Sequence, residues 1–158
     1  MRRTDREITD RQELLDVMAR CDVCRLALND ESGYPYVVPL NFGMEEREGT
    51  LYLLFHGALT GTKYDRMEQD PRATFEMDCG HQLMTAEQAC SYSCAYRSIM
   101  GSGTIRELTE PQEKYEALNA IMRHMTGRNW EMPEPAVARV SVFAIRAERW
   151  TGKRSPAN

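Results

Sequence analysis

Short stretches in which apolar and polar residues alternate recur along the chain, and they predict a protein built mainly from β-strands. The clearest is 73–78, where Ala73, Phe75 and Met77 would share one face of a strand and polar residues the other. Runs rich in β-branched and aromatic residues, bounded by turn residues, predict the remaining strands. Together with 73–78 they give about six strands, the others lying at 23–28, 36–42, 50–55, 95–107 and 136–149.

Two segments, one near each end of the chain, have the spacing of apolar residues that is typical of amphipathic helices. The first follows a cap at Thr9 or Asp10 and runs to about residue 20. The second follows a predicted cap at Thr109 and ends at Gly127, because glycine readily adopts the left-handed conformation that terminates helices. We expect both helices to pack on the sheet.

The segments between these elements complete the expected architecture. They are a charged turn over 44–49, an irregular segment over 128–135 and an aperiodic connection over 79–94, which is long enough to shape a site. Only one short helix, over 64–69, lies between strands, which is too few for a doubly wound α/β fold. The sequence therefore predicts a single domain, 1–158, of the mostly β (α+β) class: a small antiparallel barrel with flanking helices.

Composition and charge exclude several classes of function. Hydrophobic residues make up 42% of the chain and charged residues 28%, as in a globular protein, and the net charge of −4 disfavours a nucleic-acid surface. No apolar run approaches the roughly 20 residues of a membrane span, and the N-terminal sequence lacks the apolar stretch of a signal peptide. We therefore expect a cytoplasmic protein that binds neither nucleic acid nor a membrane.

The five cysteines are an odd number, which fits free thiols in a reducing compartment better than a disulfide framework. Cys21 and Cys24 have the C-x-x-C spacing of a redox pair or of half a metal site, but no second C-x-x-C accompanies them. Cys24 also begins an apolar strand pattern, where a small buried thiol is common. We expect no metal site, and the role of these two cysteines stays open.

The stretch 35–63 contains the best candidate for a ligand site. Its second predicted strand ends at His56, and a turn of small and hydroxyl-bearing residues then leads to Lys63 and the short helix. Backbone N–H groups at a helix start, the positive end of its dipole and a lysine charge would together hold a phosphate. A hairpin followed by an ordinary connection explains the same residues without a ligand.

The order of motifs along the chain resembles a known family. The run VVPLNFG, followed by LYLLFHGALTGTKYD and by Asp70-Pro71, is similar to the FMN-binding split barrel of the pyridoxamine 5'-phosphate oxidase-like superfamily. The run YRSIMGSGTIRELTEPQEKYEALNAIMRHMTG and the closing TGKR resemble its nitroimidazole-resistance (Nim) branch. The resemblance spans about 21–153, and its specificity lies in the ordered set of motifs rather than in any one of them.

This resemblance implies a six-stranded antiparallel split barrel, a homodimer, and one FMN at each of two sites between the subunits. His56 would be the catalytic group, donating a proton during reduction, because an imidazole titrates near neutral pH. Around the FMN, the resemblance places Val38, Pro39, Leu40 and Asn41 along the ring, His56, Gly57 and Ala58 beside it, Thr62 and Lys63 at the phosphate, Tyr96, Arg97 and Ser98 as the YRS motif, and Trp150 and Lys153 on the final strand. Which subunit supplies each contact stays open.

Structural roles compete with these functional ones. His56 could be a hydrogen-bonded histidine at the barrel rim, Lys63 a solvated lysine, and Trp150 a residue packed at the dimer contact. His81 could cover the substrate side of the site or be a solvated loop histidine. His124, near the end of the second helix among charged residues, is interpreted as a surface residue that interacts with the helix C-terminus.

The resulting hypothesis is an FMN-dependent oxidoreductase, a Nim-like reductase of nitroaromatic or nitroimidazole compounds. The chain has no GxGxxG motif, so a stably bound dinucleotide in a Rossmann unit is not expected, and the electron donor and substrate stay open. Pyridoxamine 5'-phosphate oxidase activity is an alternative, weakened by the lack of extra basic residues for a second phosphate ester. A non-catalytic flavin- or haem-binding protein, with His56 or His81 as haem ligand, is the other.

Overall fold

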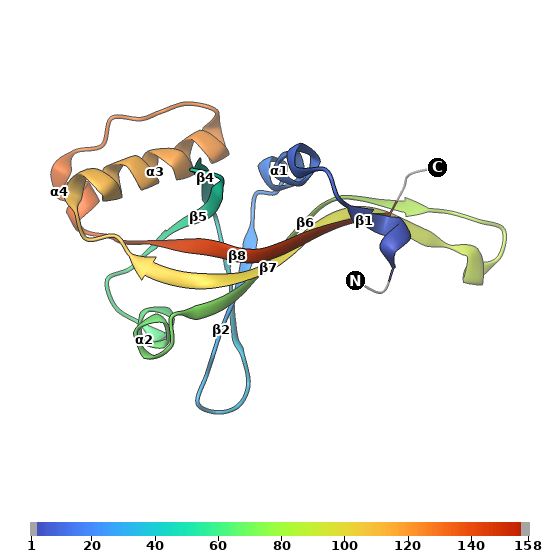
Figure 1. Ribbon diagram of the computed structural model, residues 1–158, viewed down its shortest axis with the longest axis horizontal. Helices are drawn as coiled ribbons and strands as arrows, with labels where there is room; N and C mark the ends of the chain where they lie inside the picture. Colours follow the sequence, from blue (N-terminus) through green and yellow to red (C-terminus); the bar gives the residue numbers. More distant parts are fainter. Residues whose placement is uncertain (1–2, 156–158) are drawn as a thin grey trace.

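Figure 1 shows a computed structural model of the chain, which describes residues 3–155. These residues form one antiparallel sheet of eight strands in the order β3-β2-β6-β7-β8-β5-β4, with β1 paired to β8. The strands are β1 (Glu7–Ile8), β2 (Cys24–Leu28), β3 (Tyr36–Leu40), β4 (Gly43–Arg47), β5 (Thr50–Gly57), β6 (Arg72–Met84), β7 (Ser93–Glu107) and β8 (Ser141–Ser155). The helices are α1 (Arg11–Ala19), α2 (Thr62–Gln69), α3 (Pro111–Thr126) and α4 (Glu134–Ala138), with 3-10 turns η1 (Thr4–Arg6) and η2 (Ala89–Ser91).

The sheet curls into a barrel that is left open at one seam. Strands β3 and β4 follow each other in the chain, yet they stand at opposite ends of the strand order and share no ladder. The fold is therefore a split barrel, and the prediction of a mostly β, antiparallel split barrel with flanking helices is confirmed. The count of six strands was too low, because the short β1 and the charged β4 were not predicted as strands.

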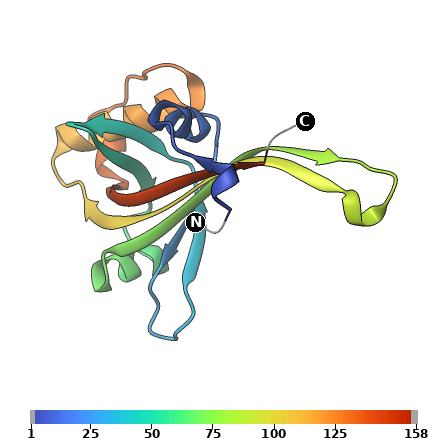
Figure 2. The ribbon, with the colours of Figure 1, turned by 45° about the vertical axis from the view of Figure 1, so that its right-hand side comes forward.

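Two of the longest strands, β6 and β7, extend beyond the body of the barrel and form an arm. Strands β6 and β7 continue as a two-stranded hairpin, drawn in green and yellow at the right of Figure 2. The prediction of an aperiodic connection over 79–94 was wrong for most of its length, since β6 runs to Met84 and β7 begins at Ser93. Solvent reaches both faces of this hairpin, so its sequence carries no alternation of apolar and polar residues. A register shift between Cys79 and Gln82, with Gly80 at a φ of 69°, separates the arm from the body.

The predicted strands 36–42 and 50–55, which flank the predicted charged turn, do not pair with each other. Most of the segment predicted as a charged turn, 44–49, belongs to β4, and the turn itself is confined to Glu48 and Gly49, both with positive φ. Strand β5 pairs with β4, whereas β3 pairs with β2. Charged residues in β4 fit its position, because β4 is an edge strand and charges at an edge discourage pairing with other chains.

The helix ends show which local signals were reliable. Asp10 caps α1 by accepting a hydrogen bond from the backbone N–H of Glu13 at 2.8 Å, and Gly127 ends α3 in the left-handed conformation, as predicted. Thr109 is not the cap of α3, since Glu110 occupies that position without a side-chain hydrogen bond. The β-strand predicted over 136–149 begins only at Ser141, because its first residues complete α4.

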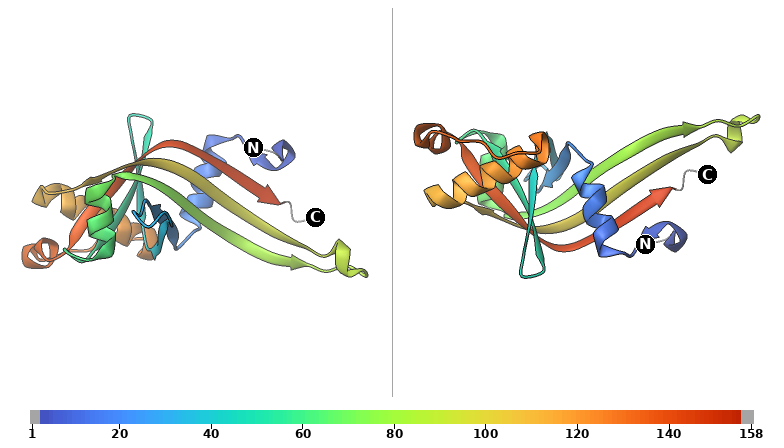
Figure 3. Two further views of the ribbon diagram at one scale, coloured as in Figure 1. Left: turned by 90° about the horizontal axis from the view of Figure 1, so that it is seen from below. Right: turned by 90° about the horizontal axis from the view of Figure 1, so that it is seen from above.

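Two groups of buried side chains hold these layers together. The larger fills the barrel and includes four phenylalanines that are fully buried: Phe42, Phe55, Phe75 and Phe143. The smaller joins α3 and α4 to β5 and β8. Figure 3 shows α1 and α3 along one side of the long strands, seen from above, and α2 on the other, seen from below. Among residues 3–155, no helix combines the length and the hydropathy that crossing a bilayer would require.

Candidate functional site

One group of predicted site residues lies where β5 ends and α2 begins. After Gly57 the chain turns through Ala58 to Gly61, whose φ of 123° suits glycine, and α2 starts at Thr62. The Lys63 side chain folds back over this turn, with Nζ 3.5 Å from the backbone oxygen of His56. A Cβ on Gly57 would lie 2.3 Å from that Nζ, so glycine is what leaves room for the lysine. The structure thus brings His56, Gly57, Ala58, Thr62 and Lys63 together as the sequence predicted.

Charge and burial perturb the two titratable residues of this group. The Lys63 Nζ lies 5.3 Å from the centre of the Phe143 ring, and burial lowers the pKa of Lys63. The residue His56 is exposed at the surface, but partial burial of its ring, followed by the charge of Lys63, lowers its pKa below 6.5. His56 is therefore mostly neutral at pH 7, and Lys63 carries a charge that no neighbouring carboxylate among residues 3–155 neutralises.

The start of α2 adds backbone donors to the lysine. The first intrahelical hydrogen bond runs from the N–H of Asp65 to the oxygen of Gly61 at 3.1 Å, so the preceding N–H groups have no partner within the helix. No side chain caps this end. Free N–H groups, the helix dipole and Lys63 all favour an anion at this point.

Strand β3 divides the second predicted group between two faces. Val38 and Leu40 are half-buried and pack against the barrel core, whereas Val37 and Pro39 are exposed on the outer face. Asn41 donates a hydrogen bond from Nδ2 to the backbone oxygen of Asp22 at 3.0 Å. A flat ligand on the outer face would therefore meet Pro39 and Val37 rather than Val38 and Leu40. Sequence reasoning missed Val37, which the alternation along the strand could have identified.

The YRS motif on β7 and the residues on β8 are likewise split between faces. Ser98 is paired with Lys153, and the Lys153 Nζ lies 5.9 Å from the centre of the Tyr96 ring, so these three residues share the outer face. Burial raises the pKa of Tyr96, but contacts with Lys153 and Arg6 lower it by more, and the net shift is downward.

Arg97 and Trp150 point to the opposite face, toward α1. Arg97 pairs with Arg154, which contacts Glu13 of α1, and the Arg11 guanidinium of α1 lies 5.2 Å from the centre of the Trp150 ring. Trp150 and Lys153, which were predicted to close the site together, are therefore not brought together within one chain.

The residues around the start of α2 are called the α2 end below, and Tyr96, Ser98 and Lys153 are called the YRS group. These two groups lie far apart along β8. His56 is paired with Val142 of β8, and Ser98 with Lys153 of the same strand. Eleven residues of extended chain span about 36 Å at roughly 3.3 Å per residue. One chain therefore holds two separate groups of predicted site residues, and no single FMN reaches both within it.

An exposed face of the sheet lies between β3 and the YRS group. Residues paired across neighbouring strands point to the same side of a sheet, so rows of side chains cross this face. One row joins Pro39, Arg25, Glu76, Met100 and Thr151. Met100 and Val37 are each 55% exposed, so this face presents apolar side chains to solvent. We call this surface, formed by the outward residues of β3, β2, β6, β7 and β8, the outer face.

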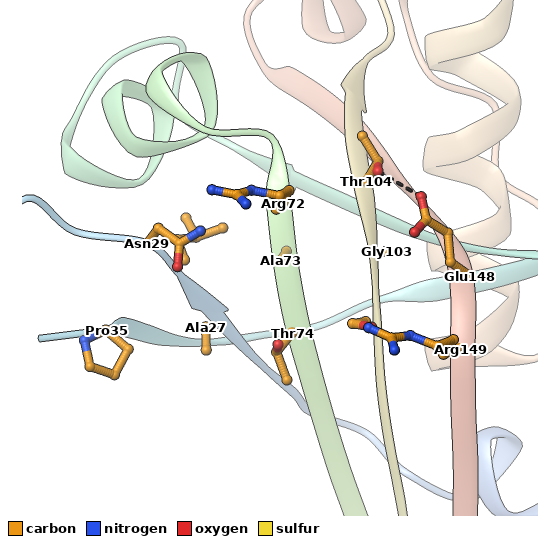
Figure 4. Close-up of a pocket in the computed structure, with 12 residues that line it drawn as sticks. Ala27, Asn29, Pro35, Arg72, Ala73, Thr74, Gly103, Thr104, Glu148 and Arg149 are labelled. Atoms are coloured by element: carbon orange, nitrogen blue, oxygen red, sulfur yellow. Dashed lines mark hydrogen bonds between the residues drawn. The ribbon is translucent and has the colours of Figure 1, made fainter. Parts of the chain in front are cut away.

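A shallow groove of about 270 Å³ crosses one end of the outer face, and Figure 4 shows the residues that line it. Its floor is made of small residues, and Arg72 and Arg149 stand on opposite sides. Thr104 donates a hydrogen bond to Glu148 at 2.8 Å, while Arg72 is paired with Asp70 at 2.6 Å. None of the predicted site residues lines this groove. Only when Asp70, which lies outside the lining, is counted do two carboxylates match the two arginines of the groove.

The other two histidines make polar contacts, and Cys21 and Cys24 are buried. The Nε2 of His81 lies 2.6 Å from Oδ2 of Asp78, on the arm side of the outer face. His124 is half-buried: its Nε2 lies 2.7 Å from the backbone oxygen of Cys21 and its ring 4.3 Å from that of Phe42, so its interpretation as a surface residue was wrong. Burial raises the pKa of Cys21 and raises that of Cys24 to about 12. Within residues 3–155, no cluster of three or more His, Cys, Asp or Glu side chains could hold a metal.

Comparisons with known proteins find a family and several solved structures that are similar to this chain. The family model described as pyridoxamine 5'-phosphate oxidase matches residues 10–154. The crystal structure of a candidate 5-nitroimidazole antibiotic resistance protein from Bacteroides thetaiotaomicron is 32% identical, with a TM-score of 0.81 over 94% of this chain and 86% of that one. A comparison with curated proteins finds no significant match.

Two further solved structures share the fold at lower identity. The FAD and heme binding protein from Mycobacterium smegmatis is 21% identical, with a TM-score of 0.81 over 96% of this chain and 74% of that one. The flavocytochrome Anf3 from Azotobacter vinelandii is 17% identical, with a TM-score of 0.79 over 99% and 72%. The expected resemblance, including that to a nitroimidazole-resistance protein, is confirmed, and the chain belongs to the pyridoxamine 5'-phosphate oxidase family.

Proposed function

We propose that this chain is an FMN-dependent oxidoreductase that reduces nitroimidazole-like compounds. The observation that carries the proposal is the α2 end, where Lys63 lies over the backbone of His56 at the start of a helix, in a member of this family. The substrate class rests on the 32% identity to the candidate 5-nitroimidazole resistance protein over almost the whole chain.

The residues at the α2 end fit the phosphate of FMN. Lys63 supplies a positive charge, and the start of α2 supplies unpaired N–H groups. Burial lowers the pKa of Lys63, which means that its charge is held partly away from water, and a phosphate beside it would compensate for that loss. Gly57 keeps the space around the amine free of a side chain.

Bound FMN would supply hydride transfer to the substrate, and the chain's own residues would position the reactants and move protons. His56 stands next to the phosphate-binding turn, and because its pKa is lowered, its protonated form is a minor fraction at pH 7 but a stronger acid than an ordinary imidazolium. The outer face offers Pro39 and Val37 as an apolar surface for a flat ring. Tyr96, beside Lys153, supplies a hydroxyl whose ionised form is stabilised.

A homodimer explains why the candidate residues form two groups. The outer face exposes apolar side chains such as Met100 and Val37, and it carries the YRS group about 36 Å from the α2 end along β8. If two chains pack through their outer faces, the α2 end of one chain can meet the YRS group of the other. We propose that each FMN binds between two chains in this way.

Haem or FAD binding is the alternative with a specific observation behind it. The Mycobacterium smegmatis protein of the same fold is described as binding both FAD and heme, and His81 and His56 are both exposed here. Against an axial role for His81, its Nε2 is held by Asp78. Pyridoxamine 5'-phosphate oxidation is disfavoured, because Arg97, a cation that could hold a second phosphate, faces α1 within its own chain.

The test is an absorbance titration of the purified protein with FMN, FAD and haemin, followed by anaerobic turnover with a reduced nicotinamide and a nitroimidazole. We expect a shifted flavin spectrum with FMN, weakened in Lys63→Ala and unchanged in Lys114→Ala, a matched lysine on α3. A Soret band without flavin binding would establish the haem alternative. Flavin binding without reduction of any nitro compound would contradict the proposed reaction.

A further inference from the structure

The residue that follows Lys63 ties the start of α2 to the sheet. The hydroxyl of Tyr64 donates a hydrogen bond to Oε2 of Glu107 at 3.1 Å. The other carboxylate oxygen, Oε1, accepts a hydrogen bond from the hydroxyl of Ser141 at 3.0 Å. Glu107 is the last residue of β7 and Ser141 the first of β8, so one carboxylate joins three elements.

The same chain of contacts reaches the other side of the candidate site. Ser141 is 2% exposed and is paired with Gly57, the glycine over which Lys63 folds. A small cleft of about 160 Å³ lies between α2 and the sheet, lined by Tyr64, Glu68, Glu107 and apolar residues that include Phe143. Phe143 is also the ring beneath the Lys63 amine. The Tyr64 hydroxyl, the Glu107 carboxylate and the Lys63 amine therefore surround one short stretch of β8.

Two further polar contacts hold the later part of α2. Arg66 forms an ion pair with Asp30 at 2.7 Å, and Asp70, after the helix, accepts a hydrogen bond from Asn29 at 2.8 Å. Both contacts fix the helix to the connection between β2 and β3.

No side chain caps the start of α2, and in the part of the chain that the structure describes two side chains of its first turn bond to the sheet: Tyr64, to Glu107, and Lys63, to the His56 backbone oxygen at 3.5 Å. The Tyr64 bond is the shorter, and it leaves the Lys63 amine free to turn toward an anion.

We propose that Tyr64, Glu107 and Ser141 form a positioning device that holds the first turn of α2 in place to bind the flavin phosphate. Tyr64 and Glu107 act as positioning residues: they fix the N–H groups and Lys63 and do not touch the phosphate. The inference rests on the proposed flavin function and deepens it. It assigns a preference for phosphorylated over unphosphorylated flavin to residues that do not contact the flavin.

The device predicts selectivity between two flavins that differ only in the phosphate. Without the Tyr64 hydroxyl, α2 keeps its apolar packing but its first turn loses its hydrogen bond to Glu107, so the N–H groups and Lys63 are no longer held toward one point. The contribution of the phosphate to binding falls, whereas that of the ring stays. The hydroxyl also contacts a carboxylate that raises the pKa of Tyr64, as expected for a hydrogen bond donated to a charged acceptor.

The experiment is a fluorescence titration of the flavin-free full-length protein with FMN and with riboflavin. Tyr64→Phe is compared with the wild type and with a control, Tyr115→Phe. Tyr115 lies on α3, and its hydroxyl donates a hydrogen bond to the backbone oxygen of Trp130 at 3.3 Å. We expect Tyr64→Phe to weaken FMN binding roughly 3- to 10-fold, the usual effect of one such hydrogen bond, with riboflavin unchanged. Ser141→Ala should show the same selectivity with a smaller loss, and Tyr115→Phe should change neither affinity.

Three results would overturn the proposal in distinguishable ways. Equal weakening of FMN and riboflavin in Tyr64→Phe would show a general structural role. Unchanged FMN binding in both Tyr64→Phe and Ser141→Ala would show that the device does not position the site. A wild-type protein that binds neither flavin would contradict the proposed function itself, and this is visible before any variant is measured.

Discussion

The two ends of β8 carry the two halves of the candidate site, and they are built differently. At the α2 end, Lys63, Gly57 and Phe143 are in contact within one chain, and the Tyr64–Glu107 hydrogen bond ties the helix to the sheet. At the YRS end, Tyr96, Ser98 and Lys153 lie on an open sheet face. The first half is held by contacts within one chain, whereas the second is an open surface. On the proposed function, phosphate binding would belong to the single chain and ring binding to a dimer.

The largest effect is expected from the catalytic role assigned to the α2 end. Replacing His56 by glutamine keeps a hydrogen-bonding side chain but removes the titrating group. We expect nitro-compound turnover to fall about 100-fold, the lower range for loss of a general acid, while FMN affinity changes little. The measurement is steady-state turnover with FMN saturating. His81→Gln, on the arm side of the outer face, is the matched control, and an equal loss in both variants would contradict the assignment to His56.

The next effect separates the two halves by their contribution to FMN binding. Lys63→Ala removes a charge-assisted contact to phosphate and should weaken FMN binding about 30-fold. The double variant Tyr96→Ala/Lys153→Ala, at the YRS end, should weaken it about 10-fold and should weaken riboflavin binding as well, because it acts on the ring. Titration with both flavins measures this contrast. If both variants changed riboflavin affinity equally, the assignment of the phosphate to the α2 end and of the ring to the YRS end would be contradicted.

Two glycines offer a comparison of stability with binding. A Cβ on Gly152 would lie 2.2 Å from Leu14 Cδ2 and 3.0 Å from Ile99 Cδ1, in the packed layer between α1 and β8. Gly152→Ala should therefore lower the free energy of unfolding by about 1–3 kcal/mol, the usual cost of overpacking. Gly57→Ala meets only the mobile end of Lys63, so it should leave stability within about 1 kcal/mol of the wild type and weaken FMN binding instead. Urea denaturation and FMN titration of both variants test this reversal.

The smallest effect concerns the pKa of His56. Partial burial and then the charge of Lys63 hold it below 6.5, so Lys63→Ala should move it upward, toward 6.5, by removing the second cause. NMR titration of the flavin-free protein measures it, and the chain has only three histidines to assign. Because the folded pKa is depressed, the folded state binds fewer protons, and the His56 contribution to stability is lost as the pH falls from 6.5 through the folded pKa. An unchanged His56 pKa in Lys63→Ala would contradict an effect of the Lys63 charge on the His56 ring.

Sequence predicted the fold class well because most strands alternate and their turns carry glycine. It failed where alternation is absent or misleading. The arm has solvent on both faces, and β4 consists largely of charged residues at an edge. The residues at 136–138 suit a strand by composition, but Pro135, one position earlier, lies in the first turn of α4.

For the site, the local motif was more predictable than the distribution of residues over faces. The five predicted site residues within 56–63 are close in sequence and lie together in the structure. Trp150 and Lys153 are also close in sequence, yet three positions along a strand place them on opposite faces. The role of Glu107 had no local signal, since its contacts with Tyr64 and Ser141 join residues 43 and 34 positions apart.

The most direct test of the division between chains is the FMN content of mixed dimers. Chains carrying Lys63→Ala and chains carrying Tyr96→Ala/Lys153→Ala are co-expressed with different affinity tags, and dimers containing both are isolated. If each site takes its α2 end from one chain and its YRS group from the other, a mixed dimer has one wild-type site, and we expect one tightly bound FMN per dimer. If both halves came from the same chain, every site in the mixed dimer would carry a defect. Mixed dimers without a tightly bound FMN would contradict a site shared between two chains.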